Sequence, residues 1–209
     1  MKYGARFRLL AALLPFGSIA TGIYLFHSAW CAILFYHSGI LLILFINGQW
    51  DIRRGVFSGW NSFSGIGLSL LLFGNGLLFI LLWPIISLQP DILSESLSNL
   101  GLSGISLWIF AAWYVTVHPF LEEVFWRKYL LSSSRRPALT DCAFAAYHVL
   151  VLLLFLRLRW VLVSFLALTL TAWLWRSLAV RYRGLAIPVV SHMAAGLSTF
   201  AAIFFLVNR

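Results

Sequence analysis

The sequence predicts an all-α, polytopic membrane protein with about seven transmembrane helices and a cytoplasmic N-terminus. Of its 209 residues 62% are hydrophobic and only 10% are charged, which is too little charge for the surface of a soluble domain. The apolar residues also gather into runs long enough to cross a bilayer, for which a helix needs roughly 20 residues. The distribution of basic residues between these runs indicates the orientation.

Seven apolar segments are expected to be spans, and short loops join them. They cover residues 7–26, 29–46, 65–87, 104–126, 140–157, 160–178 and 185–207. The basic start followed by an apolar run is also typical of a signal peptide, but the run continues to Phe26 without an A-x-A site. We therefore expect an uncleaved first span and a single membrane domain over residues 1–209.

The basic residues fall mainly on one side if the N-terminus is cytoplasmic. Only Arg157, Arg159 and Arg209 then lie outside, and the others lie inside: Lys2, Arg6, Arg8, Arg53, Arg54, Arg127, Lys128, Arg135, Arg136, Arg176, Arg181 and Arg183. This split follows the positive-inside rule and accounts for the net charge of +9 without a nucleic-acid partner. We expect a multi-pass protein of a cell membrane, the bacterial inner membrane, with the lipid bilayer as a partner.

The fourth apolar segment ends in two adjacent carboxylates, which are costly inside a membrane and call for a functional explanation. Glu123 and Arg127 are four residues apart, so they can pair on one helix face. Glu122 points about 100° away from that face. It is therefore expected to face a cavity, where it could act as a base.

Two histidines are expected at a similar depth in the membrane. At roughly 1.5 Å per residue, Glu122 lies about 7 Å from the cytoplasmic end of its span, His148 about 12 Å and His192 about 11 Å. A carboxylate and two imidazoles in one layer are typical of a hydrolytic site. The same pattern would also fit a proton path or a metal site.

Three motifs in this half of the chain carry a resemblance to a known family. Residues 122–127 read E-E-V-F-W-R and match E-E-x-x-x-R, residues 144–148 read F-A-A-Y-H and match F-x-x-x-H, and His192 follows in the last span. Their order and spacing resemble the CAAX protease and bacteriocin-processing family, also called CPBP or Abi, of glutamate-type intramembrane endopeptidases. We expect residues 101–209 to form the catalytic core, while residues 1–100 carry no recognisable motif.

The resemblance implies a role for each matching residue. Glu122, with His148, would activate the attacking water, and Glu123 with Arg127 would hold the site in register. His192 would stabilise the oxyanion that forms on the scissile carbonyl. The substrate would be a membrane-anchored peptide or protein, processed at a CAAX-type end or at a C-terminal tag.

One position departs from the family pattern. The last motif usually reads H-x-x-x-N or H-x-x-x-D, but residue 196 of this chain is glycine. Loss of one oxyanion donor lowers a rate about 100- to 1000-fold. The second oxyanion donor is therefore missing, supplied by water or replaced by a group from elsewhere in the chain. If it is missing, the alternative function is that of a non-catalytic bacteriocin-immunity or membrane scaffold protein.

Several other interpretations were left open by the sequence. No cofactor is expected, although a glutamate and two histidines can also form a zinc site. A proton-coupled transporter is a third function, but no inverted repeat supports it. His118, one turn before Glu122, could orient Glu122 or have no role. His27 and His37 are expected to lie toward the other end of the fold as structural residues, and Cys31 and Cys142 to be packing residues.

Overall fold

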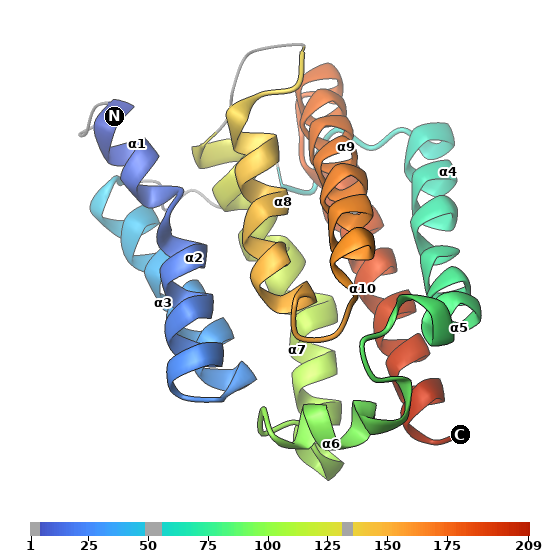
Figure 1. The fold of residues 1–209 in the computed structure, drawn as a ribbon. Helices are drawn as coiled ribbons and strands as arrows, with labels where there is room; N and C mark the ends of the chain where they lie inside the picture. Colours follow the sequence, from blue (N-terminus) through green and yellow to red (C-terminus); the bar gives the residue numbers. More distant parts are fainter. Residues whose placement is uncertain (1–4, 49–55, 131–135) are drawn as a thin grey trace.

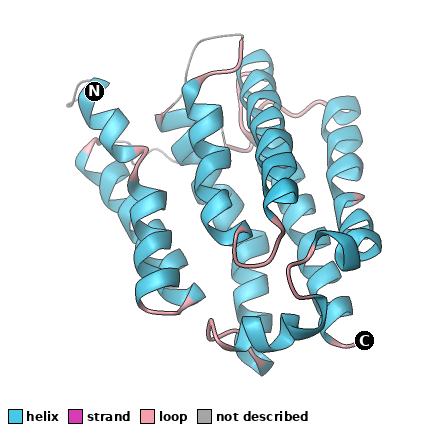
Figure 2. Cartoon of the chain, in the orientation of Figure 1, coloured by secondary structure: helices cyan, strands magenta, loops and turns pink. Residues whose placement is uncertain are grey.

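The computed structural model describes residues 5–48, 56–130 and 136–209, and these residues form helices joined by loops and turns (Figure 2). The first half contains α1 (Ala5–Ala11), α2 (Leu14–Ile19), a π-helical segment η1 (Ala20–Leu25), α3 (Ala29–Ile46), α4 (Ser62–Phe73) and α5 (Asn75–Ile86). The second half contains the 3-10 turn η2 (Pro90–Ile92), α6 (Leu93–Ser98), α7 (Gly104–Glu123), a π-helical segment η3 (Val124–Tyr129), α8 (Leu139–Leu152), α9 (Leu158–Tyr182) and α10 (Ala186–Val207).

Five of the described helical segments are long and apolar enough to cross a membrane. They are Ala29–Ile46, Ser62–Ile86, Gly104–Tyr129, Leu158–Tyr182 and Ala186–Val207. The remaining two expected spans correspond to the shorter apolar helices Leu14–Leu25 and Leu139–Leu152. The all-helical, multi-pass class is therefore confirmed, whereas the count of seven and the cytoplasmic N-terminus stay predictions.

Two expected boundaries were wrong by several residues. The fifth segment was expected to continue to residue 157, but α8 ends at Leu152 and a turn follows. The sixth was expected to end at residue 178, but α9 continues to Tyr182, where Arg183 ends it with a left-handed backbone conformation (φ 54°). Hydropathy alone could not locate either end, because apolar residues continue through the turn after α8.

The helices surround α7, which carries the two adjacent glutamates (Figure 1). One group consists of α2 and α3, which pack on each other, and α2 also contacts α8. On the other side α10 packs against α4, α5 and α7, and α9 packs against both α8 and α10. Residues from α3, α7, α8 and α10 therefore converge on the middle of the molecule.

Local sequence explains where α3 begins and where α7 changes from an α-helix to a π-helix. Ser28 starts α3, because its side chain accepts a hydrogen bond from the backbone N–H of Cys31 at 3.2 Å. Pro119 lies inside α7 and cannot donate a backbone hydrogen bond. The helix then continues as the π-helical segment η3 directly after Glu123. Such π-helical turns are frequent at functional sites.

A buried ion pair joins α8 to α9. The Nη2 atom of Arg176 lies 2.7 Å from Oδ2 of Asp141, and its Nε lies 2.9 Å from Oδ1. Asp141 also accepts a bond from the backbone N–H of Ala138 at 2.8 Å, where α8 begins. Arg176, which the sequence indicated only as a topology signal, is thus 1% exposed and fully engaged in packing.

Replacing Asp141 by Asn is expected to destabilise the protein strongly, because it leaves the buried Arg176 guanidinium without its counter-charge. Removing one member of a buried ion pair costs about 3–5 kcal/mol. Thermal unfolding of the purified protein in detergent measures this loss. The control is Glu95→Gln, which changes an exposed carboxylate on α6. Equal unfolding temperatures for both variants would contradict the role of the pair.

Candidate active site

Glu123 is the centre of an ion-pair group that links α7 to α10. Its Oε2 lies 3.2 Å from Nε of Arg127, one helical turn later, as the spacing predicted. Its Oε1 lies 3.0 Å from Nδ1 of His192 on α10. The Arg127 guanidinium lies over the ring of Phe144, 4.1 Å from its centroid. Glu123 therefore holds His192 and Arg127 in place and is itself 0% exposed.

The two oxygens of Glu122 have different surroundings. Oε1 accepts hydrogen bonds from two tyrosine hydroxyls, from Tyr36 on α3 at 2.7 Å and from Tyr147 on α8. Oε2 faces two histidines, with Nε2 of His118 at 3.2 Å and Nε2 of His192 at 3.8 Å. Since Oε1 already has two donors, Oε2 is the oxygen that can accept a further proton.

His148 reaches Glu122 through a tyrosine and does not contact it directly. Its Nδ1 lies 2.8 Å from the backbone carbonyl of Phe144, which can only accept, so the neutral ring carries its hydrogen on Nδ1. Nε2 is then a lone pair, and it lies 3.2 Å from the Tyr147 hydroxyl. That hydroxyl also contacts Glu122. With a single hydrogen, Tyr147 can bond either Glu122 or His148 and thereby couples them.

A second pair of histidines lies on the other side of Glu122. Nε2 of His37, from α3, is 3.1 Å from Nδ1 of His118, and Nδ1 of His37 accepts from the indole of Trp113 at 3.0 Å. The prediction that His37 lies toward the other end of the fold was therefore wrong. The sequence places His37 in a span without a motif, and only the packing of α3 on α7 brings it to Glu122. His118, whose role the sequence left open, contacts Glu122 directly.

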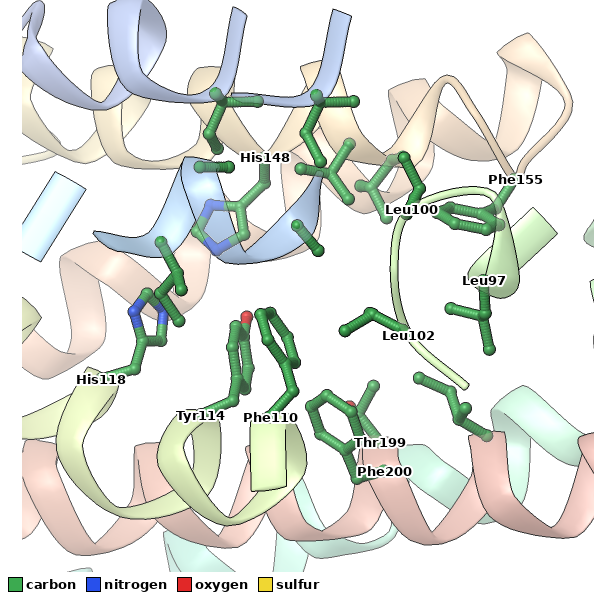
Figure 3. A pocket seen from close by; sticks show the side chains of 18 of the residues that line it. Leu97, Leu100, Leu102, Phe110, Tyr114, His118, His148, Phe155, Thr199 and Phe200 are labelled. Carbon is green, nitrogen blue, oxygen red and sulfur yellow. The ribbon is translucent and has the colours of Figure 1, made fainter. Parts of the chain in front are cut away.

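A largely apolar cavity of about 270 Å³ begins at these residues. His118, His148 and Tyr114 lie at one end of it, and leucines of α6 and the following loop, Leu97, Leu100 and Leu102, line the other end (Figure 3). Glu122 was expected to face a cavity, but it lies behind this lining and is 0% exposed. Its partners Tyr36, Tyr147 and His118 form the wall instead.

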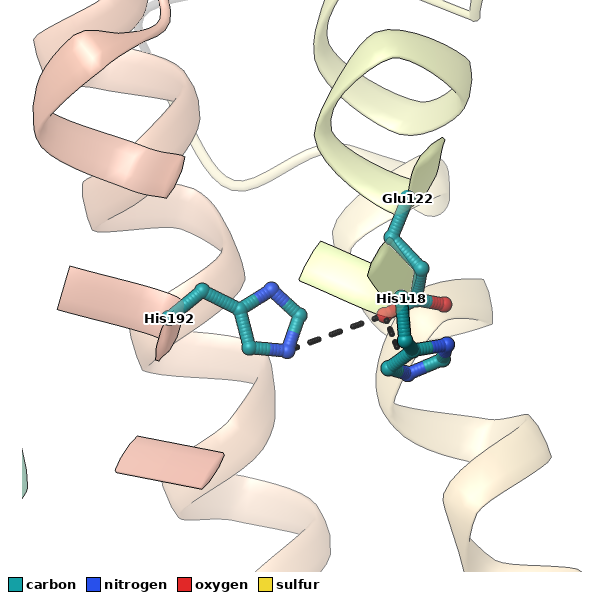
Figure 4. Close-up of side chains that lie close together, drawn as sticks. All are labelled: His118, Glu122 and His192. Carbon is teal, nitrogen blue, oxygen red and sulfur yellow. Dashed lines mark ion pairs between the residues drawn. The ribbon is translucent and has the colours of Figure 1, made fainter. Parts of the chain in front are cut away.

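Three of these side chains have a spacing that a metal ion could bridge. One donor atom each of His118, Glu122 and His192 lies within 4.8 Å of the others, and Figure 4 shows both imidazoles directed at the Glu122 carboxylate. The hydrogen-bond pattern does not fit a metal, however. Because Trp113 donates to His37 and His37 donates to His118, the neutral His118 carries its hydrogen on Nε2. That nitrogen offers no lone pair to an ion.

Gly196 leaves room for an aromatic ring of α7. A Cβ atom at this position would lie 3.8 Å from Cδ1 of Tyr114 and 3.7 Å from Cα of Val115. The Tyr114 ring stacks on His118 with 4.4 Å between centroids, and its hydroxyl points into the cavity (Figure 3). The place of the missing family side chain is thus next to a tyrosine that presents a hydroxyl to the same cavity.

Comparison with known proteins gives a family match for the second half of the chain. Residues 104–198 match the family model described as type II CAAX prenyl endopeptidase Rce1-like. Over these residues the chain is similar to the Rce1-like family. The match contains Glu122, Glu123, Arg127, His148 and His192, and it lies within the expected core of residues 101–209. Searches of curated proteins and of solved structures found no significant match to the chain.

The Rce1-like segment does not contain the whole cluster around Glu122. Tyr36 and His37 come from α3, outside the match, and were not predicted as site residues. Trp126 and Tyr147 lie at x positions of the E-E-x-x-x-R and F-x-x-x-H motifs, which do not specify a residue type. Trp126 donates a hydrogen bond to the Tyr36 hydroxyl at 2.8 Å. A polar Tyr36-His37 pair inside an apolar span was the one signal in the sequence that could have indicated α3 as part of the site.

Proposed function

We propose that this protein is an intramembrane endopeptidase that hydrolyses a peptide bond of a membrane-anchored substrate by Glu/His activation of water. The observation that carries the proposal is the asymmetry of Glu122, whose Oε1 is occupied by two tyrosine hydroxyls while Oε2 faces His118 and His192. A buried carboxylate with one oxygen held and the other able to accept a proton is suited to a general base. The match to a protease family supports the same chemistry.

The reaction needs only water and the peptide. The water oxygen bonds to the carbonyl carbon while one of its protons passes to Oε2 of Glu122, and the carbonyl oxygen becomes the oxyanion. The carbon–nitrogen bond then breaks, the oxyanion returns to a carbonyl, and the proton passes to the leaving nitrogen. Tyr147 links Glu122 to the free Nε2 of His148, so this histidine can share the proton held by Glu122.

Two side chains are suited to stabilise the oxyanion. Glu123 fixes the His192 ring through Nδ1, which leaves Nε2 facing Glu122, and His192 would donate from Nε2 once it carries a proton there. The second donor would be the Tyr114 hydroxyl, which takes the place of the asparagine or aspartate that the family usually has at position 196. A donor aimed at the developing negative charge is typical of acyl-transfer sites.

The cavity supports a substrate with an apolar anchor. Most of its lining is aliphatic or aromatic, and its polar end lies at His118 and His148. An isoprenyl chain or an apolar segment of a membrane-bound peptide could pass from the bilayer into this lining without exposing apolar surface to water. We propose that such a group occupies the cavity while the scissile bond lies at its polar end, in a protein of the bacterial inner membrane.

Cleavage of candidate substrates tests this function. The purified protein in proteoliposomes is mixed with prenylated and unprenylated C-terminal CAAX peptides, and mass spectrometry locates the cut. We expect cleavage of an apolar-anchored peptide at an unchanged rate after treatment with a chelator. The reason is that Nε2 of His118 carries a hydrogen and offers no lone pair to a metal ion. Loss of cleavage with the chelator and recovery with zinc would assign a metalloprotease instead.

Filling the cavity is expected to weaken binding of the anchored substrate. Val151 on α8 lines the cavity, and Val151→Trp would occupy part of it. The KM for an anchored peptide should rise about 10-fold or more, since one extra or missing methylene group in an apolar pocket already changes substrate discrimination by about that factor. Val163→Trp on the exposed surface of α9 is the matched control. An unchanged KM for Val151→Trp would place the anchor elsewhere.

A further inference from the structure

Two hydrogen bonds and one ion-pair contact form a continuous chain to Glu122, and its middle member, His37, lies outside the segment that matches the protease family. It begins at the indole of Trp113, passes through His37 on α3 and His118 on α7, and ends at Oε2 of Glu122. Its three contacts measure 3.0, 3.1 and 3.2 Å. Both histidines are 3% exposed, so solvent does not compete for these bonds.

The direction of every bond in this chain follows from its two ends. An indole N–H can only donate, so Nδ1 of His37 is a lone pair and the neutral ring carries hydrogen on Nε2. That hydrogen points at Nδ1 of His118, which must therefore accept. His118 then carries its own hydrogen on Nε2, and this nitrogen lies 3.2 Å from Oε2 of the Glu122 carboxylate, which can only accept when ionised.

We propose that Trp113, His37 and His118 form a one-directional hydrogen-bond relay that positions Glu122 and keeps it ionised as the base of the reaction. This role rests on the proposed function. The opposite tautomer of His118 would turn a lone pair toward Oε2 and favour the protonated carboxyl, which cannot accept a proton from water. The relay excludes that tautomer, because His37 offers only a hydrogen to Nδ1 of His118.

Ring packing holds the relay in register. The His118 ring stacks on the Tyr114 ring with 4.4 Å between centroids, and the His37 centroid lies 5.3 Å away with 28° between the two imidazole planes. Trp113 stacks on His37 with 5.9 Å between centroids. Rotation of either imidazole would break its ring contacts and the hydrogen bond between the two histidines. The relay residues are therefore positioning residues, and Glu122 is the group that reacts.

Substitutions at His37 separate the relay from simple packing. His37→Phe keeps a ring but removes both hydrogen bonds, and His37→Gln keeps a donor that can reach His118. We expect His37→Phe to lower kcat about 10- to 100-fold with KM unchanged, as for a small misplacement of a reacting group. His37→Gln should recover most of that loss. Trp30→Phe, which removes a 2.9 Å indole bond to Ser106 outside the relay, should leave kcat unchanged.

The tautomer of His118 gives a readout that does not require protease activity. Nitrogen NMR of the histidine-labelled protein should show His118 protonated at Nε2 in the wild type, and loss of this single tautomer in Trp113→Phe and in His37→Phe. Protonation of wild-type His118 at Nδ1 would overturn the relay even if every variant misfolds. A wild-type kcat in folded His37→Phe would overturn the positioning role of the relay. The expected His118 tautomer in a protein without peptidase activity would contradict only the proposed function.

Discussion

Replacing Glu122 by Gln is expected to lower kcat by about 1000-fold or more while the protein remains folded. General-base catalysis contributes about 100- to 10,000-fold, and an amide cannot accept the proton of the attacking water. The glutamine carbonyl can still accept from Tyr36 and Tyr147, which bond Oε1 in the wild type. Single-turnover cleavage of an anchored peptide in proteoliposomes measures the change.

Two controls make this result specific to the base. Glu95→Gln changes an exposed carboxylate on α6 and should keep the wild-type rate. Thermal unfolding of Glu122→Gln should show a cooperative transition close to that of the wild type. Wild-type cleavage by the folded variant would exclude Glu122 as the base, and an immunity or scaffold phenotype that survives the substitution would favour the non-catalytic alternative.

Replacing Tyr114 by Phe is expected to lower kcat about 100-fold with little change in KM. The family's usual second oxyanion donor is absent at Gly196, and a Cβ atom at this position would lie 3.8 Å from Cδ1 of Tyr114. The hydroxyl points into the cavity (Figure 3). Loss of one oxyanion donor costs about 100- to 1000-fold in kcat. Steady-state kinetics on the anchored peptide gives both constants.

The hydroxyl and the ring can be tested separately. Tyr182→Phe removes a hydroxyl that contacts Ser64 at 3.0 Å. Tyr182 does not line the cavity, so this variant should leave kcat unchanged. Tyr114→Ala combined with Gly196→Asn restores the family donor in the space vacated by the ring and should recover part of the rate lost in Tyr114→Ala alone. A wild-type kcat in Tyr114→Phe would show that the hydroxyl is not the second donor.

The pairing of Glu123 with Arg127 could be predicted because both residues lie on one helix. Their spacing alone fixes which face they share, and the structure places them 3.2 Å apart. The same reasoning separated Glu122 from that face. The expected depth of His192 was also useful, since it contacts Glu123 and approaches Glu122. In each of these cases the helical rise and period were sufficient.

Other parts of the site depend on contacts between helices that the sequence does not specify. A helical period gives the direction of a side chain but not the neighbouring helix that it meets. Tyr36 and His37 are therefore invisible as site residues until α3 packs beside α7. The same limit concealed that His148 reaches Glu122 only through Tyr147, and that Glu122 lies behind the wall of the cavity.

The sequence by itself determined the membrane class, most of the helices and the five residues that match the protease motifs. Composition and run length suffice for the first two, because a bilayer admits few structures for a long apolar segment. Only the tertiary structure decided the direction of the hydrogen bonds around Glu122. That direction depends on a donor-only indole at Trp113 and a carbonyl at Phe144, and both reach the histidines through distances of about 3 Å that only the folded chain defines.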